Sequence, residues 1–131
     1  MSTLTDVLET PTPLIMGIIG HTNKQSERSL IDTVLTPFLQ ECGRVPDRVL
    51  VPSEGHSSIY IQEWAESLHV ATQVFYSDWK RHGKMAQILR DDRIQQECTH
   101  VLIFAGPRST RWEKVATVLA RKGVYVMTSS S

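Results

Sequence analysis

Five short apolar runs alternate with longer segments of helical periodicity, and this alternation constrains the fold more than any other feature. The runs lie at residues 14–20, 48–51, 70–76, 100–105 and 124–127. The segments between them are too long for hairpin turns and carry apolar residues at helical spacing, so successive strands should run parallel and be joined by helices. We therefore predict an α/β protein with a three-layer α/β/α, Rossmann-like fold and a five-stranded, mainly parallel sheet.

The predicted helices follow from the spacing of their apolar residues. They cover about residues 25–42, 57–68, 85–97 and 110–122. Pro37 should kink or shorten the first helix, and Gly43 and Gly123 should end the first and last. Leu68, Met85 and Val118 fall on apolar faces and are expected to point inward. Residues 77–84 (SDWKRHGK) are polar and are expected to form a loop.

Length and composition indicate one domain. The chain has 131 residues, and we assign residues 14–128 to the domain, 1–13 to a flexible arm and 129–131 to a tail. No apolar run approaches the roughly 20 residues of a membrane span, and the arm lacks the apolar stretch of a secretory signal. We expect a cytoplasmic protein that does not enter membranes.

Charge and cysteine content exclude several classes of function. Fourteen basic residues balance fourteen acidic ones, so the chain has no general attraction for nucleic acid or anionic lipid. Cys42 and Cys98 are far apart and form no CxxC pair, and we expect two buried free thiols. Glu54 and His56 lack a third ligand at metal-site spacing, so neither a metal nor another cofactor is predicted.

The candidate site follows from the fold rule that ligands bind beyond the carboxyl ends of parallel strands, where strand order reverses. Four loops meet this condition: residues 20–24, 52–58, 77–84 and 106–110. The clearest is the strand–turn–helix junction from His100 to Glu113.

The first two loops contain small and polar residues. In the first, Gly20 permits close backbone approach, and the amides after it, with His21 and Thr22, are candidate ligand contacts. Neither GxGxxG nor GxxxxGK[ST] is present. In the second loop, Ser53 and Gly55 are candidate contacts. The alternative for both loops is an ordinary turn with a helix cap.

The third and fourth loops combine cations with hydroxyls or an aromatic ring. Trp79 is suited to stack on a base and Lys84 to meet a phosphate, or else Trp79 packs as a lid over a solvated loop. The cluster Arg90-Asp91-Asp92-Arg93 has the pattern of surface ion pairs. In the fourth loop, the anion-binding candidates are Gly106, Arg108, Ser109 and Thr110, with Arg111 as a further cation. The alternative is a capping box of Thr110 and Glu113.

The order of these segments resembles the SLOG superfamily of Rossmann-like proteins, especially its YpsA/YspA-related branch and, more distantly, its LOG- and DprA-like members. The corresponding residues are Gly20-His21, Ser53-Glu54-Gly55-His56, Trp64-Ala65, Asp78-Trp79-Lys80 with Gly83-Lys84 and Ala86, Arg90-Asp91, and Ala105-Gly106-Pro107-Arg108-Ser109-Thr110. The resemblance spans about residues 14–127. It implies a domain that binds a nucleotide or a nucleotide-derived ligand, with a sensor among its roles, and that forms a homodimer. The helices carrying Trp64 and Trp112 would be a possible dimer surface.

The last of these turns is also similar to the PGGxGTxxE turn of LOG-type phosphoribohydrolases, which cleave nucleoside monophosphates at the N-glycosidic bond. That similarity implies catalytic roles for Arg90 and Glu113. Pro107 and Ser109 replace two of the family's glycines, and Asp91 stands where the YpsA-like proteins usually have asparagine. Three hypotheses remain open: a nucleotide-binding domain, an N-glycosidic hydrolase, and a non-catalytic interaction protein with a degenerate pocket.

Overall fold

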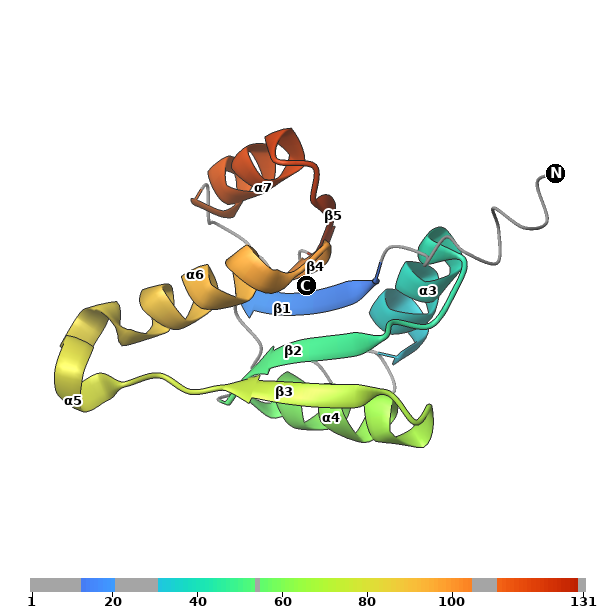
Figure 1. Ribbon diagram of the computed structural model, residues 1–131, viewed down its shortest axis with the longest axis horizontal. Helices are drawn as coiled ribbons and strands as arrows, with labels where there is room; N and C mark the ends of the chain where they lie inside the picture. Colours follow the sequence, from blue (N-terminus) through green and yellow to red (C-terminus); the bar gives the residue numbers. More distant parts are fainter. Residues whose placement is uncertain (1–12, 21–30, 54, 105–110, 130–131) are drawn as a thin grey trace, which may run out of the picture.

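A computed structural model describes residues 13–20, 31–53, 55–104 and 111–129 (Figure 1). Its strands are β1 (Ile15–Gly20), β2 (Arg48–Pro52), β3 (Ala71–Phe75), β4 (His100–Phe104) and β5 (Tyr125–Ser129). They form one sheet in the order β3-β2-β1-β4-β5, and every neighbouring pair is parallel. The predicted α/β class and five-stranded sheet are confirmed.

Two apolar layers flank the sheet and confirm the three-layer prediction. Its helices are α3 (Thr36–Cys42), α4 (His56–Ser67), α5 (Trp79–His82), α6 (Ala86–Glu97) and α7 (Arg111–Arg121). On one face, Phe38 of α3 and Ile61 of α4 pack in a cluster with Ile18 of β1. On the other face, Ile94 of α6 and Leu119 of α7 pack with Ile19 of β1. Alternate residues of the central strand therefore face opposite helical layers.

Gly17 sets how closely α6 approaches the centre of the sheet. A Cβ atom at Gly17 would lie 2.8 Å from Cγ2 of Ile94 and 2.9 Å from Cβ of Cys98. Only a residue without a side chain fits beneath α6 at this point.

The first predicted helix is confirmed only over its described part. Residues 31–42 begin with a π-helical turn (Ile31–Leu35) and continue as α3. Pro37 lies in the first turn of α3, directly after the π-helical turn. Gly43 closes the helix with φ 75°, and its N–H donates to the Leu39 carbonyl.

The predicted loop at residues 77–84 is wrong, because most of this segment is helical. It contains α5 and a 3₁₀ turn (Gly83–Met85) leading into α6. The Asp78 side chain accepts a hydrogen bond from the Arg81 amide at 3.2 Å and caps α5. Figure 1 shows α5 standing well away from the end of β3, so this segment forms a projecting arm.

Three residues predicted to point inward are exposed. Val118 and Met85 are each about half exposed, and Leu68 is 38% exposed. Met85 lies on the projecting arm, where no layer covers it, and Leu68 is the residue at which α4 ends. Trp64 and Trp112, by contrast, are buried in the two apolar layers. Their rings therefore fill the core and offer no surface to a partner.

The remaining predicted elements differ from the observed ones by one or two residues. Strand β5 continues to Ser129, one residue past the predicted end of the domain. Gly123 has φ 87° and follows α7 as predicted. None of the described helices is long and apolar enough to cross a membrane.

Candidate functional site

The strand order reverses between β1 and β4, because the chain moves outward from β1 through β2 and β3 and then returns to β4 on the other side. Gly20 pairs with Phe104 at the carboxyl ends of these strands. Gly20 has φ 102°, and a side chain there would collide with the Phe104 carbonyl. Glycine is thus required at the point where a ligand site is expected.

Much of the predicted site lies outside the described residues. The loops that follow β1 and β4 contain His21, Thr22, Gly106, Arg108, Ser109 and Thr110. These six candidate contacts remain predictions, as does the Thr110–Glu113 capping box.

The turn after β2 leads directly into the amino terminus of α4. The Ser53 amide donates to the Phe75 carbonyl at 2.9 Å, which ties this turn to the end of β3. Gly55 is the N-cap of α4, with φ 97° and no side-chain hydrogen bond to the first turn. The predicted contacts Ser53 and Gly55 therefore precede a 12-residue helix whose N-cap residue supplies no capping side chain.

Two buried hydroxyls in the first turn of α4 were not among the predicted contacts. Ser57 and Ser58 are fully buried. Ser57 Oγ has no hydrogen-bond partner among the described residues, although a buried hydroxyl without a partner costs roughly 1–3 kcal/mol. The only signal in the sequence is the Ser57-Ser58 pair at the start of the predicted helix, which is equally typical of a helix cap.

Trp79 and Lys84 lie on the projecting arm. Trp79 is 49% exposed and Lys84 is exposed. The arm carries these two side chains away from the strand ends (Figure 1), so the structure does not bring them beside Gly20.

Arg90 and Asp91 form a buried ion pair, which corrects the prediction of a surface cluster. Each residue is 4% exposed. Nε and Nη2 of Arg90 donate to Oδ1 of Asp91 at 3.1 and 3.0 Å, and Nη1 donates to Oγ of Ser77 at 3.1 Å. Arg90 therefore ties α6 to the segment between β3 and α5. Asp92 is exposed, as the prediction required.

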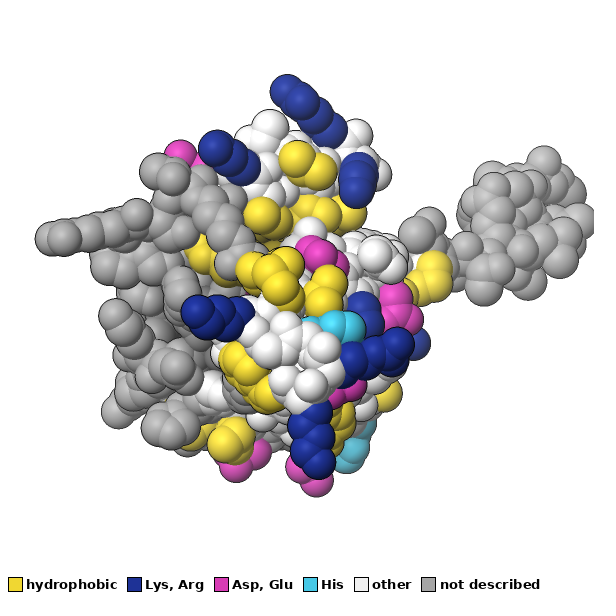
Figure 2. Space-filling view, turned by 90° about the vertical axis from the view of Figure 1, so that its left-hand side faces the viewer, with side chains coloured by type: hydrophobic (Ala, Val, Ile, Leu, Met, Phe, Trp, Pro, Cys, Tyr) yellow, Lys and Arg dark blue, Asp and Glu magenta, His cyan; other side chains and the backbone are white. Residues whose placement is uncertain are grey.

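Two adjoining hollows flank Tyr76 and Arg93. One, of about 470 Å³, is lined by residues from Gln73 of β3 to Asp78 just before α5. The other, of about 450 Å³, lies between α5 and α6 and is lined by Arg81 and Arg90 among others. Figure 2 faces the projecting arm and shows Lys and Arg side chains interspersed with apolar ones on this side of the molecule.

Glu113, the second predicted catalytic residue, lies exposed in the first turn of α7. Its backbone carbonyl accepts a hydrogen bond from the Thr117 hydroxyl at 2.9 Å. The buried Arg90 on α6 and the exposed Glu113 on α7 thus occupy different environments.

The two thiols lie at the opposite, amino-terminal edge of the sheet, where both line a cavity of about 580 Å³. Burial raises the pKa of the Cys98 thiol to about 11, and burial with the nearby Glu41 charge raises the pKa of Cys42. Both are protonated at neutral pH, which suits structural thiols. Cys98 is buried as predicted, whereas Cys42 is only partly buried. No group of three metal-ligating side chains occurs in the described ranges.

Comparisons with family models, curated proteins and solved structures gave no significant match to this chain.

Proposed function

We propose that the chain is a binding domain for a nucleotide or nucleotide-derived ligand at the carboxyl edge of its sheet. The observation that carries the proposal is the amino terminus of α4, where the N-cap Gly55 supplies no capping side chain and Ser57 Oγ is buried with no hydrogen-bond partner in the part of the chain that the structure describes. Helix amino termini attract phosphate because their first amides point outward and the helix dipole is positive there. The fully buried hydroxyl is an independent feature of the same turn.

The topology supports the same location. Because β1, β2 and β4 are parallel neighbours, the amino terminus of α4 and the required glycine at Gly20 share one edge of the sheet. This edge includes the point of strand-order reversal, at which ligands of open α/β sheets bind. Ser53, Gly55 and Ser57 would contact the phosphate, and Gly20 would allow the ligand to approach the backbone.

The arm adds a second group of candidate contacts. Trp79 has an exposed ring for stacking, and Lys84 has an ammonium group for a phosphate. Since both stand away from the strand ends, they would reach the ligand only where it extends beyond a single phosphate. This favours a ligand with two separated groups, such as a dinucleotide or ADP-ribose.

Calorimetric titration with AMP, ADP-ribose and NAD tests the proposal. We expect binding of at least one of them, and an affinity at least about tenfold weaker in Ser57→Ala, since a hydrogen bond to a charged group contributes about 1.5–3 kcal/mol. Without ligand, Ser57→Ala should raise the free energy of unfolding by about 1 kcal/mol, because it removes a buried hydroxyl that pairs with none of the described residues.

Ser67→Ala is the matched control, because Ser67 lies at the other end of α4 and donates to the Trp64 carbonyl. It should leave affinity unchanged. Absence of binding to all three nucleotides at millimolar concentration would refute the proposal. Equal affinity in wild type and Ser57→Ala would exclude the phosphate site at α4.

The hydrolase hypothesis relies on Arg90 and Glu113. The Arg90 guanidinium is engaged by Asp91 and Ser77, so the described geometry gives that hypothesis no added support. Assaying the same samples for released free base distinguishes hydrolysis from binding alone.

A further inference from the structure

Strand β3 is an edge of the sheet and lacks the features that usually protect an edge. In the described part of the chain it pairs only with β2. Residues Ala71–Phe75 contain no charged residue and no proline, and Ala71, Thr72 and Gln73 are exposed. Charges, prolines and bulges are the common means by which proteins prevent edge strands from pairing.

The direction of each backbone group on β3 follows from one hydrogen bond. The Phe75 carbonyl accepts from the Ser53 amide, so Phe75 faces β2. In a parallel strand, the N–H and C=O of one residue point to the same side and alternate along the strand. Ala71 and Gln73 therefore also face β2, whereas Thr72 and Val74 direct their backbone groups outward.

Hydrogen bonds within the chain limit the available edge at both ends. At the start, the Val70 amide donates to the Ala65 carbonyl at 2.8 Å. At the end, Nη2 of Arg93 donates to the Tyr76 carbonyl at 2.7 Å. Within the described residues, the outward N–H and C=O groups of Thr72 and Val74 have no partner. The available edge is thus short and centred on Gln73.

We propose that β3 pairs with β3 of a second copy of this chain, antiparallel, about a two-fold axis at Gln73. In this register Thr72 of each copy lies opposite Val74 of the other, and the four outward groups of each strand pair completely. Moving the axis to Thr72 would place Val74 opposite Val70. The Val70 amide is already hydrogen-bonded to the Ala65 carbonyl and could not donate to a second copy. The chain's own hydrogen bonds therefore select one register, and a two-fold contact of this kind closes at two copies.

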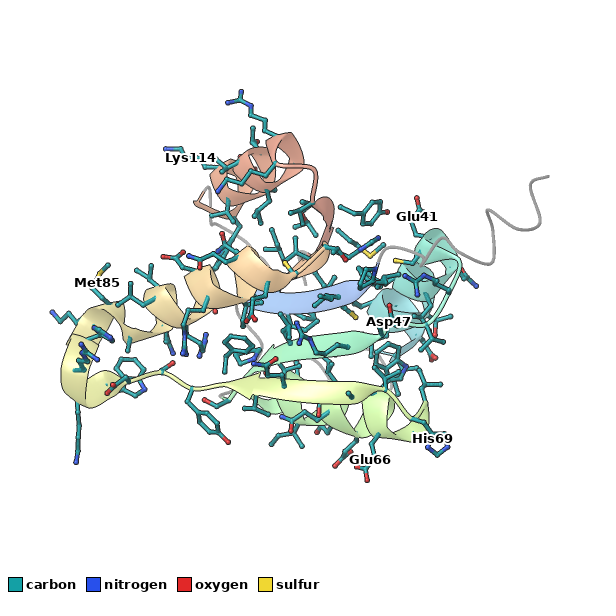
Figure 3. All side chains as sticks on the ribbon, in the orientation of Figure 1. Glu41, Asp47, Glu66, His69, Met85 and Lys114 are labelled. Carbon is teal, nitrogen blue, oxygen red and sulfur yellow. The ribbon has the colours of Figure 1, made fainter. Side chains whose placement is uncertain are left out.

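The two ends of the edge are complementary to each other. Leu68, 38% exposed, lies at the start, and Tyr76, 69% exposed, lies at the end. Figure 3 places Glu66 and His69 at the end of the molecule where β3 begins, opposite the arm with Met85. An antiparallel copy brings Tyr76 of each chain toward Leu68 of the other, twice over.

This inference goes beyond the proposed function and does not depend on it, because the interface uses none of the proposed ligand contacts. Its first test is sedimentation equilibrium of the full chain up to millimolar concentration. We expect species of 14.8 kDa and of twice that mass in the wild type. Thr72→Pro should give only the smaller species, since proline removes an outward N–H, and edge strands tolerate it. Thr72→Val keeps the N–H and should dimerise like the wild type.

The second test measures the register directly. Gln73 would face its own copy in a non-hydrogen-bonded pair with Cα atoms about 4.5 Å apart, which suits a disulfide. In a Cys42→Ser background, Gln73→Cys should form a covalent dimer under mild oxidation. Adding Thr72→Pro should reduce this product at least tenfold. Gln40→Cys places a cysteine at an exposed position of α3 and controls for crosslinks that form by random collision.

Three results would overturn the proposal: a wild type that stays monomeric at all concentrations, a dimer that persists in Thr72→Pro, or equal crosslinking at residues 73 and 40. Thermal unfolding of Thr72→Pro and Thr72→Val establishes that both are folded, so that loss of dimer reports on the edge. If a strand of a different protein bound at β3, the chain would form a complex with that protein and Gln73→Cys would give no covalent dimer. This result would also count against self-pairing.

Discussion

The buried pair of Arg90 and Asp91 shows how single residues can depart from their usual environments. Two adjacent charged residues in a helix normally remain in water, yet both are buried here, and the Ser77 hydroxyl satisfies a further donor of the guanidinium. Sequence reasoning could not find this pair, because the same pattern describes an exposed helix face. Sequence reasoning misses Ser57 for a related reason, since a serine at the start of a helix has the pattern of a cap whether or not it is buried.

Removing one partner of this pair should be costly, because a buried charge is left uncompensated. We expect Asp91→Ala to lower the free energy of unfolding by about 3–5 kcal/mol, measured by urea denaturation. Asp92→Ala, at the exposed neighbouring position, should change it by no more than about 0.5 kcal/mol. Similar losses of unfolding free energy in the two variants would show that the buried pair contributes no more to stability than an exposed charge.

Among the elements, strands were predicted more accurately than short helices. The three inner strands β1, β2 and β4 coincide with continuous apolar runs, because burial on both faces leaves a continuous hydrophobic signal. The four-residue helix α5 has no periodicity to detect, and its only signal was Asp78 at the N-cap. Val118 was assigned to the wrong face because several apolar residues of α7 compete for one buried stripe. The strand order could not be predicted, because apolar runs do not specify their neighbours.

The contact between β1 and α6 provides a test at this scale. Gly17→Ala places a Cβ atom 2.8 Å from Cγ2 of Ile94, so α6 must move away from the sheet. We expect a loss of about 1–3 kcal/mol in unfolding free energy from overpacking. Met16→Leu, a volume-conserving change on the same strand but toward the other layer, should cost less than about 1.5 kcal/mol. A neutral Gly17→Ala would mean that α6 packs more loosely than described.

At the scale of the whole molecule, acidification should reduce stability in two steps. Burial, and then the nearby Arg44 charge, lower the pKa of His100 below its ordinary 6.5. The folded state therefore binds this proton less well than the unfolded state, so the contribution of His100 is present above pH 6.5 and is lost as pH falls through the folded pKa. The hydrogen bond from the Leu14 amide lowers the pKa of Asp47. The folded state therefore binds this proton less well than the unfolded state, and the stability that Asp47 contributes is lost as the pH falls below 3.8.

Thermal unfolding across this pH range checks the first step. We expect His100→Gln to flatten the decline in midpoint temperature just below pH 6.5, whereas His82→Gln, on the exposed arm, should keep it. An unchanged pH profile in His100→Gln would assign the decline to other groups.

The position of β1 at the centre of the sheet also has a consequence for synthesis. On one side β1 pairs with β2, which in turn pairs with β3, and both strands follow within the next 55 residues of chain, counting from Gly20 to Phe75. Its partner on the other side is β4. The Ile15 amide, which donates to the Thr99 hydroxyl 84 residues away, also has to be synthesised long before its acceptor. Until that part leaves the ribosome, one side of the central strand has no neighbour. The emerging amino-terminal half therefore exposes an apolar edge that the finished protein conceals, and this is the stage at which it is most prone to aggregate.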